Sequence, residues 1–367
     1  MSTQSQPSTS KPDPIHILIG AIGAFYGSRL HQPNHPQRPV LVSLTCRSNY
    51  KHVSSNGLSM KTRSFGDYEF KPYRVYSSVI SASKNNSPKW DFVILCTKVL
   101  IGDINDSEIL LPLFNSTTQS SNPTIVLIQN GVGIETIHRQ RFPNVPIISG
   151  VTVVNAEQIE LGVVRQNRWT RISLGSFLEF EYDDQKIKSK THQNSELETK
   201  STHQIDLLVE LLKQGGIKDA EVYSERDLQL VRWHKLAINA SMNPSSILCG
   251  GLTNPEMVAD PAIRIHLTEC MKEVLRAACV IFQLESMPTG FASPEEILES
   301  ITRAKGEAIK PSMLVDWEQN RPLEIEAILA IPIRIAKRFG VELNRLQSMY
   351  AFLNQLQRQR THGSAKL

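Results

Sequence analysis

The chain has 367 residues, a length that favours two domains, and its 40% hydrophobic content is enough for two packed cores. The formal net charge of +4 is spread along the chain without a long Lys/Arg block, which argues against nucleic acid as a partner. The five cysteines are odd in number and include no Cys-x-x-Cys pair. This pattern argues against a disulfide framework and a structural zinc site, so we expect no metal.

Residues 1–14 are rich in Ser, Gln, Thr and Pro, and we expect them to form a flexible tail. They lack the apolar stretch of a secretory signal and the arginines of a transit peptide. No apolar run in the chain approaches the roughly 18 residues needed to cross a bilayer. We therefore expect a cytoplasmic protein that does not use a membrane.

Short apolar segments rich in β-branched residues recur through the first half of the chain. They are continuous rather than alternating, which is typical of strands buried on both faces of a sheet. The segments between them are helical or loop-like, a pattern that indicates a doubly wound α/β domain of the Rossmann type. We expect this domain to span residues 15–204. The predicted strands cover residues 15–19, 40–45, 90–96, 124–128 and 147–154.

The second half of the chain is predicted to be helical. Residues 178–203 contain few aliphatic residues and mixed charges, so we interpret them as an exposed, disordered insertion. Beyond them, helix-capping signals recur, which predicts an all-helical domain over residues 205–360. The expected helices cover residues 204–213, 224–248 capped by Ser224, 254–284 capped by Asn254, a helix opening at Ser293, 322–339 capped by Asn320, and 345–358.

The segment Gly20-Ala21-Ile22-Gly23 follows the first predicted strand. A dinucleotide-binding loop reads G-x-G-x-x-G, where the glycines allow a tight turn, close approach to pyrophosphate, and close packing of the next helix. Gly20 and Gly23 match the second and third glycines, but Leu18 stands where the first is expected and two residues are missing. The segment is therefore a candidate phosphate-binding loop, and a plain structural turn is the alternative.

Arg47 follows the second predicted strand, in the run Thr45-Cys46-Arg47-Ser48. Loops that bind NAD place an acidic residue near this point to hold the ribose 2′-hydroxyl, whereas NADP-binding loops place a basic one. No acid is nearby, and the Arg47 guanidinium can pair with a 2′-phosphate. A solvated surface arginine is the alternative.

Lys235, Asn239 and Asn243 recur every four residues and therefore lie along one face of the predicted helix 224–248. Apolar residues flank this polar stripe. The combination is unusual both for a solvated surface and for a core, and it suits the wall of a polar cleft. Lys235 is the candidate catalytic residue of that cleft.

Four segments combined with this helix resemble the ketopantoate reductase (2-dehydropantoate 2-reductase) family. The resemblance covers residues 15–356 in order and leaves the insertion outside. The segments are Thr97-Lys98, Gln129-Asn130-Gly131-Val132-Gly133, Ser312-Met313-Leu314-x-Asp316, and Glu324-Ile325-Glu326.

The resemblance implies that the protein uses NADP(H) to reduce a small 2-oxo acid, converting ketopantoate to pantoate. Lys235 would act as the proton donor and Glu324 as a catalytic carboxylate that contacts the substrate. Lys98 and Asn130 would contact the cofactor. The substrate-binding residues implied are Asn239, Asn243, Asn254 and Ser312.

Several of these residues also suit a purely structural function, and other functions are open for the whole chain. Ser312 and Asn254 also suit helix N-caps, and Glu324 suits the first turn of a helix as an acid that complements its dipole. At the level of function, the alternatives are a related reductase of another 2-oxo acid or ketone, a non-catalytic NADP(H)-binding protein, or another two-domain dehydrogenase. The sequence leaves the choice between monomer and homodimer open.

Overall fold

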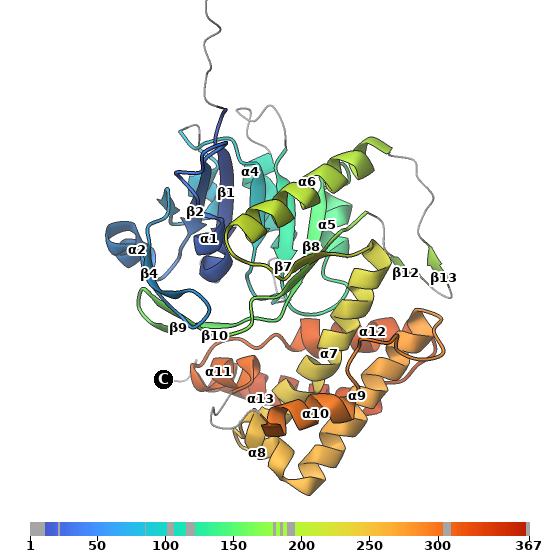
Figure 1. Cartoon of the computed structure of the whole chain (residues 1–367). Coiled ribbons are helices and arrows are strands. Elements are labelled where there is room, and N and C mark those ends of the chain that lie inside the picture. The colour runs from blue at the N-terminus through green and yellow to red at the C-terminus, as the bar shows by residue number, and fades with distance from the viewer. Residues whose placement is uncertain are drawn as a thin grey trace, which may run out of the picture.

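The computed structural model describes residues 12–20, 23–84, 86–100, 106–114, 122–178, 181–183, 186–188, 195–303 and 310–364. It consists of an N-terminal α/β domain and a C-terminal helical domain, the fold class expected from the sequence (Figure 1). The expected tail largely lies outside the described residues, as do Ala21 and Ile22.

The α/β domain is built on an eight-stranded sheet with the order β5-β2-β1-β6-β7-β8-β11-β14. The first six strands in this order are parallel, so their carboxyl ends meet at one edge of the sheet. This is the doubly wound order that binds dinucleotides at that edge. The strands are β1 (Ile15–Gly20), β2 (Val40–Thr45), β5 (Val75–Tyr76), β6 (Phe92–Leu95), β7 (Thr124–Ile128), β8 (Ile147–Thr152), β11 (Ile172–Ser176) and β14 (Ala220–Val222).

Helices cover both faces of this sheet, as the continuous apolar strands predict. In β1, Leu18 joins one hydrophobic core, and Ile17 and Ile19 join the other. The helices α1 (Ala24–Leu30) and α6 (Ser195–Gln214) contribute to the core that contains Ile17, and α3 (Val79–Ala82) and α4 (Asp106–Phe114) to the core that contains Leu18. The remaining helices of the domain are α2 (Tyr50–Asn56) and α5 (Thr136–Arg141).

A second sheet of four strands, not expected from the sequence, has the order β4-β3-β10-β9. It combines two hairpins that are far apart in the chain, and the central pair β3–β10 is parallel. Its strands are β3 (Leu58–Thr62), β4 (Gly66–Phe70), β9 (Asn155–Glu160) and β10 (Val163–Arg168).

The expected disordered insertion at residues 178–203 is partly wrong. Helix α6 begins at Ser195, well before residue 204, and Ser201 within it is fully buried. The polar composition is misleading because only one face of the helix is apolar, and Ile205 and Leu208 on that face are buried in the sheet core. A short hairpin, β12 (Glu181–Asp183) with β13 (Lys186–Lys188), also lies within the range. The rest of the range lies outside the described residues.

The expected domain boundary at residue 204 is also wrong. Helix α6 packs on the eight-stranded sheet, and β14 pairs with β11 at the edge of that sheet. The α/β domain therefore extends to about residue 223. The helical domain begins with α7 (Glu225–Leu248), which Ser224 caps by accepting a hydrogen bond from the Asp227 N–H, as predicted.

In the described residues, seven further helical segments make up this domain, and α7 runs into it from the α/β domain (Figure 1). They are α8 (Asn254–Ala259), α9 (Pro261–Ile281), α10 (Pro294–Arg303), α11 (Ser312–Glu318), the π-helical segment η2 (Glu326–Ala330), α12 (Ile331–Arg338) and α13 (Asn344–Ser364). No helix within the described ranges is both long and apolar enough to cross a membrane.

Two predicted helix starts in this domain need correction. The single helix expected from residue 254 to 284 is divided at Asp260, which caps α9 by accepting hydrogen bonds from two N–H groups of its first turn. Thr253, rather than Asn254, is the N-cap of α8. Asn320 does not cap a helix either, because it has a positive φ of 56° after α11 and residues 321–324 have no regular secondary structure.

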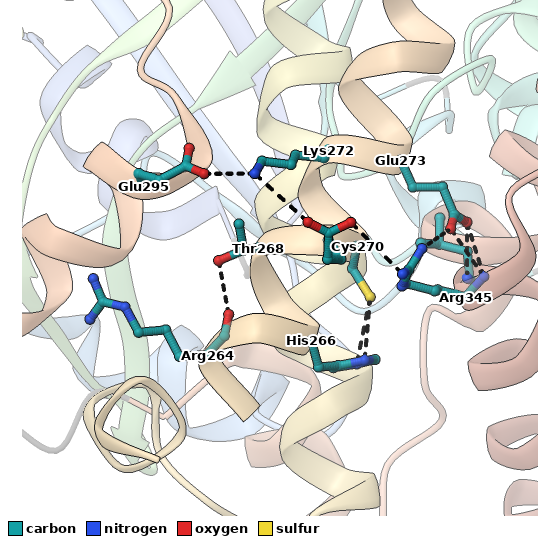
Figure 2. A network of polar contacts seen from close by, with 10 residues as sticks. Arg264, His266, Thr268, Cys270, Lys272, Glu273, Glu295 and Arg345 are labelled. Atoms are coloured by element: carbon teal, nitrogen blue, oxygen red, sulfur yellow. Dashed lines mark hydrogen bonds and ion pairs between the residues drawn. The ribbon is translucent and has the colours of Figure 1, made fainter. Parts of the chain in front are cut away.

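Polar contacts connect α9 to its neighbours (Figure 2). The buried carboxylate of Glu273 accepts hydrogen bonds from the N–H groups of Arg345 (3.1 Å) and Leu346 (3.4 Å) at the start of α13. Lys272 pairs with Glu295 of α10 at 2.8 Å. These contacts hold α9 against α10 and α13.

Candidate active site

The carboxyl edge of the parallel strands gathers the residues expected to bind the cofactor. Gly20 ends β1, Arg47 follows β2, Lys98 follows β6, and Asn130 follows β7. Because these strands are parallel neighbours in the sheet, the four residues share one edge. The sequence motifs are therefore arranged as they are in a dinucleotide-binding domain.

The glycine segment fits the close packing that such a loop requires. A Cβ atom on Gly23 would lie 2.6 Å from Sγ of Cys96 and 2.6 Å from Cδ1 of Ile19, so only glycine allows α1 to start this close to the sheet. This is the packing function of the third glycine in a dinucleotide loop. The side chain of Arg47 is exposed, which leaves its guanidinium accessible to an anion.

Asn130 connects the candidate catalytic lysine to the candidate catalytic carboxylate. The Lys235 ammonium donates a hydrogen bond to Oδ1 of Asn130 at 3.0 Å, and the Asn130 amide donates to Oε2 of Glu324 at 3.1 Å. These three side chains come from α7, from the loop after β7, and from the segment before η2. Helix α7 and the segment before η2 belong to the helical domain, and the loop after β7 belongs to the α/β domain. The hydrogen-bonded series Lys235–Asn130–Glu324 therefore forms between the two domains.

The turn that carries Asn130 lies directly against the helical domain. Gly131 has a φ of 98°, and a Cβ atom on it would lie 2.6 Å from the carbonyl oxygen of Ala327 in η2. A side chain at this position would therefore push the two domains apart. The glycine explains how Asn130 can reach Lys235 and Glu324 together.

The environment of Lys235 makes its ammonium unusually acidic. Burial and, to a smaller extent, the nearby positive charge of Arg232 lower the pKa of Lys235 to about 8, against the opposing effect of the Glu324 carboxylate. A lysine with this pKa is protonated at neutral pH and gives up its proton readily.

Glu324 is buried and is held by donors from the other domain. Its Oε1 accepts a hydrogen bond from the Val99 N–H at 3.3 Å. Burial raises the pKa of Glu324, while the hydrogen bonds from Asn130 and Val99 and the charge of Lys98 act against the increase. Glu324 directly precedes the first helical residue, Ile325, and its carbonyl oxygen accepts a hydrogen bond from the Ile328 N–H at 3.0 Å. It therefore lies at the helix N-terminus, where an acid also complements the helix dipole. Glu326, by contrast, pairs with Arg334 at 3.1 Å, away from this group.

Lys98 forms an ion pair with Asp316 of α11, with 2.5 Å between Nζ and Oδ1. Asp316 is buried and also pairs with Arg321 at 3.1 Å. In the sequence, Asp316 stands out only as part of a family motif, without a function of its own. Its spacing of four residues from Ser312 and its place in an apolar helix are the signals that point to it.

The expected substrate-binding residues are less closely grouped. Asn239 is partly buried one turn after Lys235, and Asn243 is buried one turn further along α7. Nδ2 of Asn243 and Oδ1 of Asn254 are buried without a hydrogen-bond partner in the described part of the chain, as expected of groups that bind a polar ligand. Ser312 is exposed at the first position of α11, and Pro311 is the N-cap, so the capping interpretation of Ser312 is wrong.

Two sequence-family models match the chain. Residues 15–179 match "Ketopantoate reductase PanE/ApbA", and residues 227–357 match "Ketopantoate reductase PanE/ApbA C terminal". A 2-dehydropantoate 2-reductase from Nostoc sp. (strain PCC 7120 / SAG 25.82 / UTEX 2576) is 26% identical over 333 residues, which cover 90% of this chain and 91% of that protein.

Solved structures agree with these matches. The crystal structure of 2-dehydropantoate 2-reductase from Methylococcus capsulatus has a TM-score of 0.71 and 25% identity, covering 95% of this chain and 98% of that one. The ternary structure of D-mandelate dehydrogenase with NADH and anilino(oxo)acetate has the same fold, with a TM-score of 0.69 at 18% identity, covering 95% of this chain and 100% of that one. The family models cover most of the chain, and it therefore belongs to the ketopantoate reductase family, as an NAD(P)H-dependent oxidoreductase of the class expected from its sequence.

Proposed function

We propose that the protein uses NADPH to reduce the carbonyl group of a 2-oxo acid, with 2-dehydropantoate (ketopantoate) as substrate and pantoate as product. The observation that carries the proposal is the hydrogen-bonded chain from Lys235 through Asn130 to Glu324. This chain of hydrogen bonds supports the proposal because a lysine able to lose its proton would then lie at the carboxyl edge of the sheet, where such folds bind a dinucleotide. Pantoate would be used for pantothenate biosynthesis, and we propose the cytoplasm as the place of action.

The cofactor would be held by the segment Gly20-Ala21-Ile22-Gly23 together with Arg47, Lys98 and Asn130. The bound nicotinamide supplies the hydride, and the protein supplies position and charge. Arg47 would select the 2′-phosphate of NADPH, because its guanidinium is exposed beyond β2 and forms charge-assisted hydrogen bonds.

Lys235 would be the general acid of the reaction. Reduction of a carbonyl group produces an alkoxide that must receive a proton, and the Lys235 ammonium can donate one to that oxygen. Its pKa of about 8 suits a proton donor that works near neutral pH. Asn130 accepts a hydrogen bond from the ammonium and so fixes the direction of its remaining N–H groups.

Glu324 would bind a hydroxyl group of the substrate and help to keep Lys235 charged. Its negative charge favours the protonated form of the lysine. The amides of Asn239, Asn243 and Asn254 and the hydroxyl of Ser312 would hold the carboxylate and hydroxyl groups of the acid. The unpartnered amide atoms of Asn243 and Asn254 support this assignment.

A related reductase with another 2-oxo acid as substrate would use the same chemistry. A non-catalytic NADP(H)-binding protein would not need an acidified lysine held by an asparagine and a glutamate, so the site geometry favours an enzyme. The shortened glycine segment remains the feature that favours the binding protein.

The test is an NADPH-oxidation assay of the purified chain with a panel of 2-oxo acids that includes ketopantoate, with the Lys235→Ala variant as control. We expect the highest kcat/KM for ketopantoate and a large loss in the variant. A higher kcat/KM for another 2-oxo acid would replace ketopantoate as the substrate. No oxidation of NADPH with any member of the panel would contradict the proposal.

A further inference from the structure

Arg232 and Glu135 form a buried ion pair beneath the candidate active site. Arg232 lies one turn before Lys235 on α7, and Glu135 lies at the start of α5 in the α/β domain. The Arg232 side chain is 3% exposed and that of Glu135 0%, and Nε of Arg232 lies 3.0 Å from Oε1 of Glu135. The pair therefore joins the catalytic helix to the sheet domain in a place that water does not reach.

The Arg232 guanidinium also binds the backbone on both sides of Asn130. Its Nη1 donates hydrogen bonds to the carbonyl oxygens of Gln129 (2.9 Å) and Gly131 (3.0 Å). Its Nη2 donates to Oγ of Ser149 (2.6 Å) and to the carbonyl oxygen of Gly150 in β8 (3.2 Å). The planar fork of an arginine can hold several acceptors in fixed positions, which a lysine cannot do. The turn that presents Asn130 is thus fixed from the same helix that carries Lys235.

Glu135 is itself held by donors from both domains. Its Oε1 accepts hydrogen bonds from Ser149 at 2.6 Å and from Gln229 of α7 at 2.9 Å. Burial alone would raise the pKa of Glu135, but Arg232, Ser149 and Gln229 lower it, so this carboxyl group stays ionised. Because the Glu135 carboxylate lies against the Arg232 guanidinium, its negative charge offsets part of the positive charge that acts on Lys235.

We propose that Arg232, balanced by Glu135, is a positioning residue of the reaction that fixes the Asn130 turn and sets the charge experienced by Lys235. The inference rests on the proposed general-acid function of Lys235. It assigns two separable effects to one side chain. The guanidinium fork fixes the place of Asn130, and the net charge of the Arg232–Glu135 pair sets how readily Lys235 holds its proton.

The charged groups around Lys235 give the sign of each effect. Arg232 on α7 disfavours the charged ammonium, and Glu324 before η2 favours it, while Asn130 is neutral. Glu135 on α5 acts mainly by offsetting Arg232, and Lys98 and Asp316 act on Glu324. Removing the charge of Arg232 should therefore raise the pKa of Lys235. Removing the charge of Glu135 leaves Arg232 uncompensated and should lower it.

The experiment measures the titration of Lys235 directly in the full chain. Labelling by acetic anhydride, quantified by mass spectrometry of the peptide that contains Lys235 across a pH series, gives its midpoint without any need for turnover. We expect Arg232→Met to move the midpoint up by about half a unit or more, and Glu135→Gln to move it down. Arg232→Lys should leave the midpoint nearly in place, because the charge remains, yet lower kcat roughly 10- to 100-fold because the fork is lost.

The double variant Arg232→Met with Glu135→Gln keeps the test valid if a single variant fails to fold. A single variant leaves a buried charge unpaired, whereas the double variant removes both charges at similar volume. It should raise the midpoint, by less than Arg232→Met alone. The matched control is Arg171→Met, which breaks the exposed pair, at 2.7 Å, between Arg171 just before β11 and Glu221 of β14. It should change neither the midpoint nor the turnover.

Shifts of the two single variants in the same direction, or an unchanged midpoint in the double variant, would overturn the inference. Full kcat in Arg232→Lys would refute the positioning effect of the fork. If the unaltered chain reduces no 2-oxo acid while the midpoints move as expected, the proposed function fails and the electrostatic placement of Arg232 stands. The two failures are therefore distinguishable.

Discussion

Lys98 of the α/β domain and Asp316 of the helical domain form an ion pair across the candidate active site, with 2.5 Å between Nζ and Oδ1. The two residues lie 218 positions apart in the sequence, and both side chains are mostly buried. The pair therefore does more than a surface salt bridge would, because it connects the domains where the cofactor is proposed to bind. If Lys98 binds a phosphate group of the cofactor, as proposed, that phosphate must compete with Asp316 for the Lys98 ammonium.

This competition gives the first prediction. Lys98→Met should raise the Kd for NADPH by roughly tenfold, the effect of one lost charge-assisted hydrogen bond. Asp316→Asn should lower the Kd, because Lys98 is then free to bind the anion. Fluorescence titration with NADPH measures both, and Lys61→Met, which breaks an exposed pair with Asp67, is the control. Equal Kd values in all four proteins would remove Lys98 from cofactor binding.

The second prediction concerns the chemical step. Lys235→Ala should lower kcat by roughly 10²–10⁴-fold, the usual contribution of a general acid, while NADPH binding persists. In the unaltered chain, the rate of reduction should fall as the pH rises above about 8, because the pKa of Lys235 is about 8 and only the protonated form donates. The pH profile of kcat/KM measures this limb. A rate that stays constant up to pH 10 would exclude Lys235 as the acid.

The third prediction is a gain in stability when Lys235 is removed. Burial lowers the pKa of Lys235 from 10.5 to about 8, so the folded state disfavours the ammonium at neutral pH. Lys235→Met should therefore raise the free energy of unfolding at pH 7, by on the order of 1–2 kcal/mol after the lost hydrogen bond to Asn130 is subtracted. The gain should decrease as the pH rises from about 8 to 10.5, where the unfolded lysine also becomes neutral. Urea unfolding at pH 7 and pH 10 checks it, and an equal gain at both pH values would contradict the explanation.

Much of this fold is predictable from the sequence because its signals are local. Continuous apolar runs indicate the parallel strands β1, β2 and β7, and Ser224 marks the start of α7. The second sheet is not predictable in this way. Its strands pair segments far apart in the chain, as Val163 does with Ser59, and much of their surface faces water.

In the candidate site, too, residues with a local sequence pattern can be predicted, and residues defined by contacts between the domains cannot. Lys235, Asn239 and Asn243 are visible as a helical stripe, and Lys98 and Asn130 follow predicted strands. The contact of Glu324 with Asn130 requires the two domains to be docked, so no local pattern contains it. The functions of Arg232 and Asp316 cannot be predicted for a related reason. A charged residue on a helix is usually exposed to solvent, so its burial is not expected from the sequence.

The fourth prediction concerns cofactor choice. Arg47 follows β2 with an exposed side chain, where an acid would select NADH. The unaltered chain should therefore prefer NADPH, and Arg47→Ala should weaken NADPH binding while it leaves NADH binding unchanged. The ratio of kcat/KM for the two cofactors measures the preference. Equal use of both cofactors by the unaltered chain would contradict this function of Arg47.

The last prediction concerns the length of the glycine segment. All six residues of β1 are paired in register with β2, from Ile15 with Val40 to Gly20 with Thr45, and Pro14 precedes the strand. The strand therefore cannot slide forward to supply the two residues that the segment lacks before Gly23, and Gly23 is fixed against Cys96 and Ile19. Some N–H contacts to the pyrophosphate should be lost, each of them a charge-assisted hydrogen bond contributing about 1.5–3 kcal/mol.

We therefore expect NADPH binding to be weaker than with a complete loop, by at least about tenfold in Kd, since one such hydrogen bond corresponds to a factor of that size. Inserting Gly-Ala after Ala21 restores the spacing G-x-G-x-x-G and should tighten binding in a fluorescence titration. Inserting the same two residues after Gly290, in an exposed turn between α9 and α10, should not. An unchanged or higher Kd after the first insertion would mean that the short segment already binds pyrophosphate in its own geometry. Binding that appears only after the insertion would mean that the unaltered chain has lost its cofactor, and the non-catalytic alternative would then account for it better than the reductase does.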